Sequence, residues 1–162
     1  MNRLFLSIIS ATLFSVALSS CDTEGCTDPS AANYDDKADS DDGNCRYDSD
    51  PFAGKWDLTD SIETTPNVYI FEELRLMDIR IISTDRDRIR LFWKNADGSL
   101  SDTIDATAKP NTLSIAPQEF DEGFTIQGNF IYNGLYDYIE TEYRVSSDTS
   151  LVRRRGRAER RD

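Results

Sequence analysis

Apolar and polar residues alternate along most of the chain beyond Pro51, and turn-forming residues separate the alternating runs. The clearest unit is a hairpin whose strands cover 124–132 and 138–145, with apolar side chains at every second position. Asn133-Gly134 follows the first strand and is the residue pair that a two-residue type I′ turn requires. Weaker alternation covers 74–81, 89–94, 100–108 and 112–115, and Leu151-Val152 can close a last short strand.

Together these runs amount to roughly eight short strands within about 100 residues. No segment shows the apolar spacing of an amphipathic helix of three turns. The pattern therefore predicts an all-β domain, either a small antiparallel barrel or a sandwich. Within 74–81 the apolar phase changes at Met77-Asp78, which predicts a β-bulge at that point.

Residues 1–20 have the composition of an export signal. A short positive start at 1–3 precedes an almost wholly apolar run over 4–18, which is too short to be a good membrane-spanning helix. The run ends in Leu18-Ser19-Ser20-Cys21, which resembles a lipobox. The resemblance implies cleavage before Cys21 and lipid on its thiol, so the chain would be held at a membrane. The alternative is an ordinary secretory signal whose cleavage site happens to precede a cysteine.

Acidic residues directly after Cys21 bear on the membrane at which the chain is retained. Asp22 and Glu24 resemble the signal with which some Gram-negative bacteria send lipoproteins to the outer face of the outer membrane. In other bacterial groups an aspartate beside the cysteine means retention at the inner membrane. We expect a lipid-anchored protein of the cell envelope, at the outer membrane and exposed on the surface.

The chain has three cysteines, and an odd number in an exported protein normally indicates a free thiol. If Cys21 carries lipid, Cys26 and Cys45 remain as one pair, and export places them where a disulfide forms. Closing a loop of this size contributes about 3 kcal/mol in the chain-entropy estimate. That contribution matters because residues 22–50 have almost no apolar core of their own.

Residues 21–50 are expected to form the lipidated N-terminus and an acidic linker closed by that disulfide. The stretch from Cys26 to Cys45 resembles a short module of secreted bacterial proteins, with the pattern CTDP-x-A-x-NY followed by DDG-x-C. The oxygen-bearing side chains that would suit a calcium ion are Asp28, Asn33, Asp39, Asp41 and Asp42. The acid spacing is one residue short of the D-x-D-x-D-G loop, and a solvated linker with no cofactor is the competing interpretation.

Residues 51–152 resemble the small lipocalin-like lipoproteins of bacteria. Gly54-Lys55-Trp56 is similar to the G-x-W of lipocalin barrels, and I-x-P-Q, G-x-x-I-x-G and Y-x-V follow in order over 115–145. The resemblance implies a barrel that is shallow or closed, because the chain is shorter than a typical lipocalin. It also implies that Trp56 closes one end beneath an arginine of the last strand, either Arg153 or Arg154.

The aromatic side chains of this domain have two interpretations. They would either line a ligand-binding cup or form the core of a filled barrel. Tyr136 and Tyr138 fall on the outward phase, where they would contact a partner or a sugar ring. The candidate ligand or partner contacts are Trp93, Tyr132, Tyr136 and Tyr138.

Charge and composition exclude some functions. The net charge is −12, so most of the chain would repel nucleic acid. The chain has no histidine, which removes the commonest general base, and we expect no enzyme activity. Residues 153–162 carry six arginines against two acids and are predicted to be a basic tail. Such a tail would bind anionic lipid headgroups, fold onto the acidic 22–50 segment, or remain frayed.

Three functions remain for the lipid-anchored domain. The first is a binding module that holds a small apolar ligand in a barrel cup. The second is a structural or adhesive surface protein with a filled barrel, which contacts a protein or glycan partner through its outer face. The third is an inhibitor or chaperone-like accessory protein. An interior cavity favours the first, and a packed interior with exposed Tyr136 and Tyr138 favours the second.

Overall fold

The structure is a computed structural model that describes residues 22–82, 85–94 and 98–162. The predicted signal peptide and Cys21 lie outside the described residues. The described chain forms two compact units, one made of residues 22–29 and 33–45 and the other of residues 30–32 and 46–162. No helix among the described residues has the length and apolar character needed to cross a membrane.

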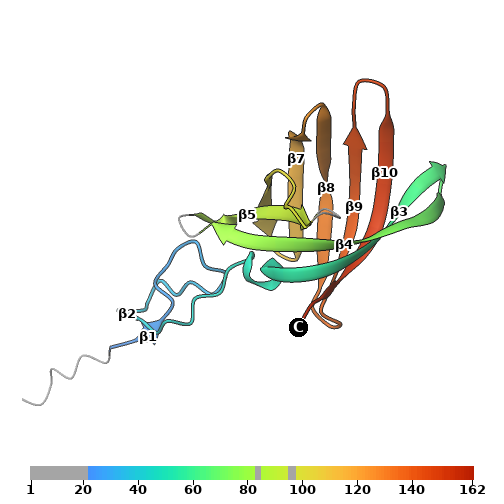
Figure 1. Ribbon diagram of the computed structural model, residues 1–162. Coiled ribbons are helices and arrows are strands. Elements are labelled where there is room, and N and C mark those ends of the chain that lie inside the picture. Colours follow the sequence, from blue (N-terminus) through green and yellow to red (C-terminus); the bar gives the residue numbers. More distant parts are fainter. Residues whose placement is uncertain (1–21, 83–84, 95–97) are drawn as a thin grey trace, which may run out of the picture. The chain divides into compact units, whose positions relative to one another are not determined.

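Eight antiparallel strands of the larger unit close into a barrel (Figure 1). Each strand pairs with the next in sequence, and the last pairs with the first. The all-β prediction is therefore confirmed, and the barrel rather than the sandwich is the fold. The strands are β3 (Gly54–Thr65), β4 (Val68–Ile82), β5 (Asp85–Lys94), β6 (Ile104–Lys109), β7 (Thr112–Asp121), β8 (Phe124–Asn133), β9 (Tyr138–Ser146) and β10 (Leu151–Arg160).

The interior of the barrel is one contiguous apolar cluster. Its largest fully buried side chains are Trp56, Phe52, Phe130, Leu58 and Met77. Phe52 belongs to a short 3-10 helix, η1 (Asp50–Phe52), and its carbonyl oxygen accepts a 2.8 Å hydrogen bond from the Trp56 indole nitrogen. Phe52 therefore closes one end of the core. The larger unit also contains residues 46–50, so it begins before the predicted boundary at Pro51.

The end of the barrel at Trp56 is covered by an arginine, as the lipocalin resemblance implied, but the arginine is Arg160. Its guanidinium lies 4.2 Å from the centroid of the Trp56 ring and donates hydrogen bonds to the carbonyl oxygens of Pro51 and Ala53. The prediction of Arg153 or Arg154 was wrong because β10 runs on to Arg160. The register places that residue opposite Trp56.

Residues 153–162 are not a tail. Nearly all of them belong to β10, which pairs with β9 on one side and with β3 on the other. Net positive charge suggested a solvated end, but the arginines alternate between two faces of a strand. Gly156 and Ala158 on the inward phase let β10 pack against the core.

The phase change at Met77-Asp78 is not a bulge. Met77 pairs with Trp56 and Trp93 in regular register, and Met77 and Ile79 are both buried. Leu74 and Leu76 are the apolar residues that face outward, so the sequence pattern was misread at its N-terminal side. The register shifts in β4 lie elsewhere, opposite Asp60-Ser61, opposite residues 63–65 and near Ile82.

The hairpin of β8 and β9 is confirmed, but its turn is longer than predicted. Asn133 pairs with Tyr138, which leaves four residues in the loop. The Asn133 side-chain oxygen accepts a hydrogen bond from the Leu135 nitrogen, and Asp137 has a φ of 50°. Asn133 therefore starts the turn through its side chain, and the left-handed residue is Asp137.

The β3–β4 hairpin continues beyond its neighbours as a two-stranded arm (residues 63–75), seen past β10 in Figure 1. Pairing of β3 with β10 ends at Ile62, and pairing of β4 with β5 begins at Leu76. The arm carries exposed apolar side chains because no strand covers it: Val68, Ile70, Phe71 and Leu74.

The smaller unit contains a two-stranded parallel pair, β1 (Glu24–Gly25) and β2 (Ser40–Asp41). Cys26 and Cys45 form the predicted disulfide. Cys26 is almost fully buried, whereas nearly all the acidic side chains of this unit are exposed or half-buried. The disulfide is therefore the principal nonlocal constraint on this unit, as its poor apolar content led us to expect.

Gly128 allows β8 and β9 to approach closely at their centre. A Cβ atom at this position would lie 2.4 Å from the Glu142 carbonyl oxygen and 2.5 Å from the Tyr143 Cβ. Gly128→Ala is therefore expected to lower the free energy of unfolding by roughly 2 kcal/mol, measured by urea denaturation. Gly134→Ala is the matched control, because its Cβ would meet only Tyr132 Cε1 at 3.5 Å. Equal losses in the two variants would contradict the close-approach argument.

Candidate functional site

A cluster of polar side chains lies inside the barrel where β3, β9 and β10 meet. Asp60 is completely buried, and its Oδ2 accepts a hydrogen bond from the Tyr143 hydroxyl. Arg154 Nη1 lies 3.3 Å from the same oxygen, and its side chain is only 11% exposed. Burial raises the pKa of the Tyr143 hydroxyl, and the Asp60 carboxylate raises it further. The Tyr143 hydroxyl therefore stays protonated and donates its hydrogen bond to Asp60.

Glycine makes room for this cluster. Gly156 lies opposite Asp60 on one side and opposite Thr141 on the other. A Cβ there would come within 2.9 Å of both the Thr141 hydroxyl and the Asp60 Cβ. Asp60 Oδ1 and Thr141 Oγ1 have no hydrogen-bond partner among the described residues. The cluster joins three strands. Because these two buried oxygen atoms lack hydrogen bonds, they reduce the free energy of unfolding.

The interior position of Trp93 corrects its prediction as a ligand or partner contact. Its side chain is 4% exposed and packs against Phe120 and Tyr143, with ring centroids 5.6 Å and 5.5 Å away. Phe130 also packs against Tyr143. These aromatic side chains contact one another within the buried apolar cluster of the barrel, so they belong to its core.

Tyr132 lies at the end of the barrel closed by Trp56. Its ring packs edge-on against Phe52 and Trp56, and its hydroxyl donates a hydrogen bond to Asp137. Arg160 also bonds Asp137, and this hydrogen bond lowers the pKa of that carboxyl. Burial raises the pKa of the Tyr132 hydroxyl. The hydrogen bond to Asp137 and the ring contacts connect the loop after β8 to this end of the core.

Tyr136 and Tyr138 lie on the outside, as predicted. Tyr136 is 68% exposed, and the two rings are stacked with an interplanar angle of 16°. The Arg157 guanidinium lies 3.8 Å from the centroid of the Tyr138 ring, on the face of the barrel formed by β9 and β10. The two tyrosine rings, with the Arg157 guanidinium beside them, form what we call the tyrosine platform, next to the β8–β9 loop.

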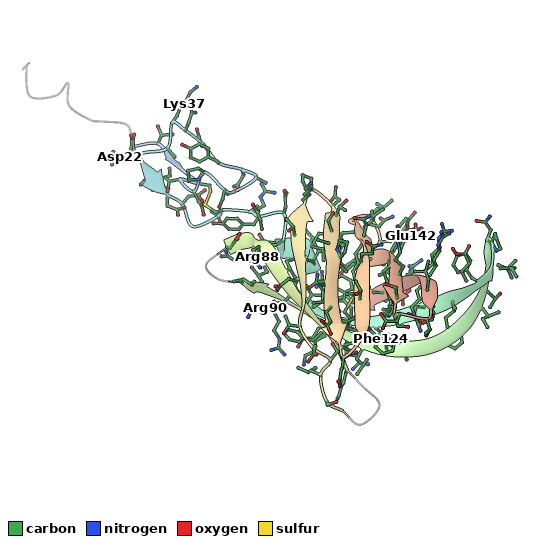
Figure 2. The ribbon with its side chains drawn as sticks, turned by 90° about the horizontal axis from the view of Figure 1, so that it is seen from above. Asp22, Lys37, Arg88, Arg90, Phe124 and Glu142 are labelled. Carbon is green, nitrogen blue, oxygen red and sulfur yellow. A yellow bond between two sulfur atoms is a disulfide. The ribbon has the colours of Figure 1, made fainter. Side chains whose placement is uncertain are left out.

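The outward side chains of β9 and β10 form a charged strip, named here the β9–β10 face. On β10 they are Arg153, Arg155, Arg157 and Glu159, and on β9 they are Tyr138, Glu140, Glu142 and Arg144. The strip covers six residue steps of β9, about 20 Å at 3.3 Å per residue. It runs from the tyrosine platform to a pocket beside the β3–β4 arm. Figure 2 labels Glu142 near the middle of this face.

Several acids of the smaller unit accept hydrogen bonds from backbone nitrogens of the same unit. Asp41 Oδ1 accepts a hydrogen bond from the Gly43 nitrogen, and Asp42 Oδ1 accepts one from the Asn44 nitrogen. The Asn33 side-chain nitrogen donates to the Asn44 carbonyl oxygen, and Asp39 lies beside the Thr23 nitrogen. In the described part of the chain, no three acidic, histidine or cysteine side chains come together as a metal site. The structure therefore does not gather Asp28 and the other four residues predicted to bind calcium into one such group.

Comparison with protein-family models, curated proteins and solved structures finds no match to this chain. Its function is therefore inferred from its own geometry. The sequence interpretation did not place Asp60 inside the barrel and named Arg154 only as a candidate to cover Trp56. Both residues lie on the apolar phase of their strands, Asp60 after Trp56 and Leu58. A charged residue at an inward position was the available signal for the buried cluster.

Removing Arg154 would take away the guanidinium that lies 3.3 Å from the buried Asp60 carboxylate. We expect Arg154→Met to lower the free energy of unfolding by roughly 3 kcal/mol in urea denaturation at pH 7. Adding Asp60→Asn removes the charge but keeps an acceptor for Tyr143, so the double variant should recover most of that loss. Arg155→Gln is the control, because its pair with Glu142 is exposed and should contribute less than about 1 kcal/mol. A double variant no more stable than Arg154→Met alone would show that the buried charge is not the cause.

Proposed function

We propose that this chain is a lipid-anchored, non-catalytic lipoprotein of the bacterial cell envelope that binds a glycan through the outside of a filled barrel. The observation that carries the proposal is the division between the two faces of the strands. The inward aromatic side chains pack against one another, whereas Tyr136 and Tyr138 are stacked on the outside. This arrangement favours outer-face binding over a lipocalin-like cup.

The composition of the β9–β10 face supports a glycan over a protein partner. Protein interfaces are usually enriched in Tyr and Arg but depleted of Glu, Asp and Lys, and charged residues are scarce at their centre. Here Glu140 and Glu142 alternate across the strands with Arg155 and Arg157, and an aromatic platform lies at one end. Stacked tyrosines offer flat apolar rings with polar hydroxyls, and charged groups beside them can hydrogen-bond sugar hydroxyls.

The lipid anchor is supported by the lipobox-like segment and by the pairing of the other two cysteines. Cys26 and Cys45 are joined, which leaves Cys21 as the third cysteine of the chain. Attachment there would present both described units on the same side of the membrane. The acidic residues after Cys21 favour the outer membrane and surface exposure.

Cells producing the chain should incorporate an alkyne-labelled palmitate analogue into it, and the label should depend on Cys21. We expect Cys21→Ser to abolish labelling and to release the protein from the membrane fraction, because acyl chains provide the anchorage. Gel fluorescence after fractionation measures both effects. Cys26→Ser with Cys45→Ser is the control and should keep the label. Label retained by Cys21→Ser would remove the anchor from the proposal.

The tyrosine platform is tested by adhesion of beads carrying the chain from residue 21 onward, with Cys21→Ser, to immobilised bacterial envelope polysaccharide. Tyr136→Ala with Tyr138→Ala is expected to weaken adhesion by roughly tenfold or more, as loss of two contact aromatics does at binding hot spots. Phe124→Ala is the matched control, because Phe124 is an exposed aromatic residue at the opposite end of β8. Unchanged adhesion of the tyrosine variant, or stoichiometric uptake of a fluorescent fatty acid by the barrel, would contradict outer-face binding.

A further inference from the structure

A polar pocket lies on the outside of the barrel between the β9–β10 face and the β3–β4 arm. Its volume is about 350 Å³, and it is lined by residues of β3, β4, β8, β9 and β10. The outward side chains that define it are Arg144, Arg153, Arg155, Gln127, Asn129 and Tyr69. We call it the arginine groove. It is larger than a single small ion needs, and its walls come from strands that the barrel closure brings together.

Two arginines stand directly opposite each other in this groove. Arg144 of β9 and Arg153 of β10 are cross-strand partners, and both side chains face outward. Like charges in this position destabilise a pair of strands, whereas opposite charges stabilise it. The next two rows of the same strand pair follow the stabilising rule, with Glu142 opposite Arg155 and Glu140 opposite Arg157. The Arg144–Arg153 row is therefore an exception that folding does not explain.

The acids of the groove neutralise its arginines only in part. Arg153 lies 3.5 Å from Glu63, and Arg155 lies 3.5 Å from Glu142. These distances are long for charge-assisted hydrogen bonds, and three of the four side chains are more than half exposed. No ion pair among the described side chains involves Arg144. The groove is thus locally positive in a chain whose net charge is −12.

Neutral side chains complete the lining. Gln127 lies opposite Arg144 on β8, and Asn129 lies opposite Glu142, so two amides border the charged rows. The Tyr69 ring closes the arm side, with the Arg155 guanidinium 5.1 Å from its centroid. Amides recognise hydroxyl groups as donors and acceptors, and an aromatic ring packs against a flat apolar face. An inorganic anion would use the arginines alone, whereas a sugar with an acidic group would use all of these side chains.

We infer that the arginine groove binds an anionic saccharide, whose acidic group lies between Arg144 and Arg153 and whose ring and hydroxyl groups contact Tyr69, Gln127 and Asn129. This assignment rests on the proposed glycan-binding function and specifies its ligand class. The acidic group is a carboxylate, sulfate or phosphate, because guanidinium groups pair with all three. Binding weakens as salt is added, because the groove is exposed to solvent.

The test is calorimetric titration of the chain from residue 21 onward, with Cys21→Ser, at low ionic strength. The probes are a galacturonate hexasaccharide, a heparin hexasaccharide, neutral maltohexaose and inorganic phosphate. We expect at least one acidic hexasaccharide to bind, and to bind more tightly than maltohexaose or phosphate. Arg144→Gln with Arg153→Gln should weaken that binding by about tenfold or more. Tyr69→Ala should also weaken it while leaving its salt dependence unchanged.

The matched control is Arg88→Gln with Arg90→Gln, which changes the net charge by the same amount. Both residues are exposed on β5 near Asp105, and Figure 2 labels them well apart from Glu142. This control should keep the affinity of the parent chain. Equal weakening in the control and groove variants, or no binding of either acidic hexasaccharide, would overturn the assignment. Phosphate binding as tight as that of the saccharides would overturn it as well.

The outcomes separate this inference from the proposed function. If Tyr136→Ala with Tyr138→Ala abolishes adhesion to polysaccharide and the groove variant does not, outer-face binding stands and the arginine groove is not its site. If the groove variant loses acidic saccharide binding and the tyrosine variant keeps its adhesion, the groove stands without the platform. If the tyrosine variant keeps its adhesion and the groove variant keeps its acidic saccharide binding, both the proposed function and the groove assignment are overturned.

Discussion

Pairing between β10 and β3 is the interaction on which the rest of the barrel depends. Without it, β3 and β10 would be two open edges, and the apolar interior would be exposed along a seam. The pairing also sets the positions of two arginines far from their partners in sequence. It places Arg160 opposite Trp56 and brings Arg154 to Asp60. The pairing of β10 with β3 therefore closes the sheet, places Arg160 over the Trp56 end of the barrel and buries the polar cluster.

Barrel closure also separates apolar side chains, at the inward positions of each strand, from charged side chains at the outward positions. Inward positions of β9 and β10 carry Ile139, Tyr143 and Ala158, and the close approaches at Gly128 and Gly156 let large side chains fill the centre. Outward positions carry the charged β9–β10 face. The buried side chains form one contiguous apolar cluster inside the barrel, whereas the charged residues of this face lie on the outer surface. The strand twist and the unpaired β3–β4 arm then make part of that surface concave.

Alternation predicted the fold well where each strand has one apolar and one polar face. The β8–β9 hairpin follows this rule at nearly every position, so its strands were located closely. Prediction failed where outward positions are apolar or inward positions are charged. Leu74 and Leu76 are apolar but face outward near the arm. The sequence pattern of β4 therefore showed an apparent change of phase at Met77-Asp78, which led to the wrong prediction of a bulge. Arg154 faces inward, and with five other arginines nearby it made β10 resemble a solvated tail.

The sequence by itself determined that this chain is all-β, that Cys26 and Cys45 pair, and that Tyr136 and Tyr138 lie outside. Each of these follows from local spacing or from residue chemistry, which the order of amino acids contains directly. Only the tertiary structure decided that the barrel encloses one contiguous apolar cluster, that Trp93 belongs to it, and that Arg144 and Arg153 stand side by side. These depend on strand register and on closure between the first and last strands. Contacts between residues so far apart in sequence are set by packing of the whole barrel, which no local pattern specifies.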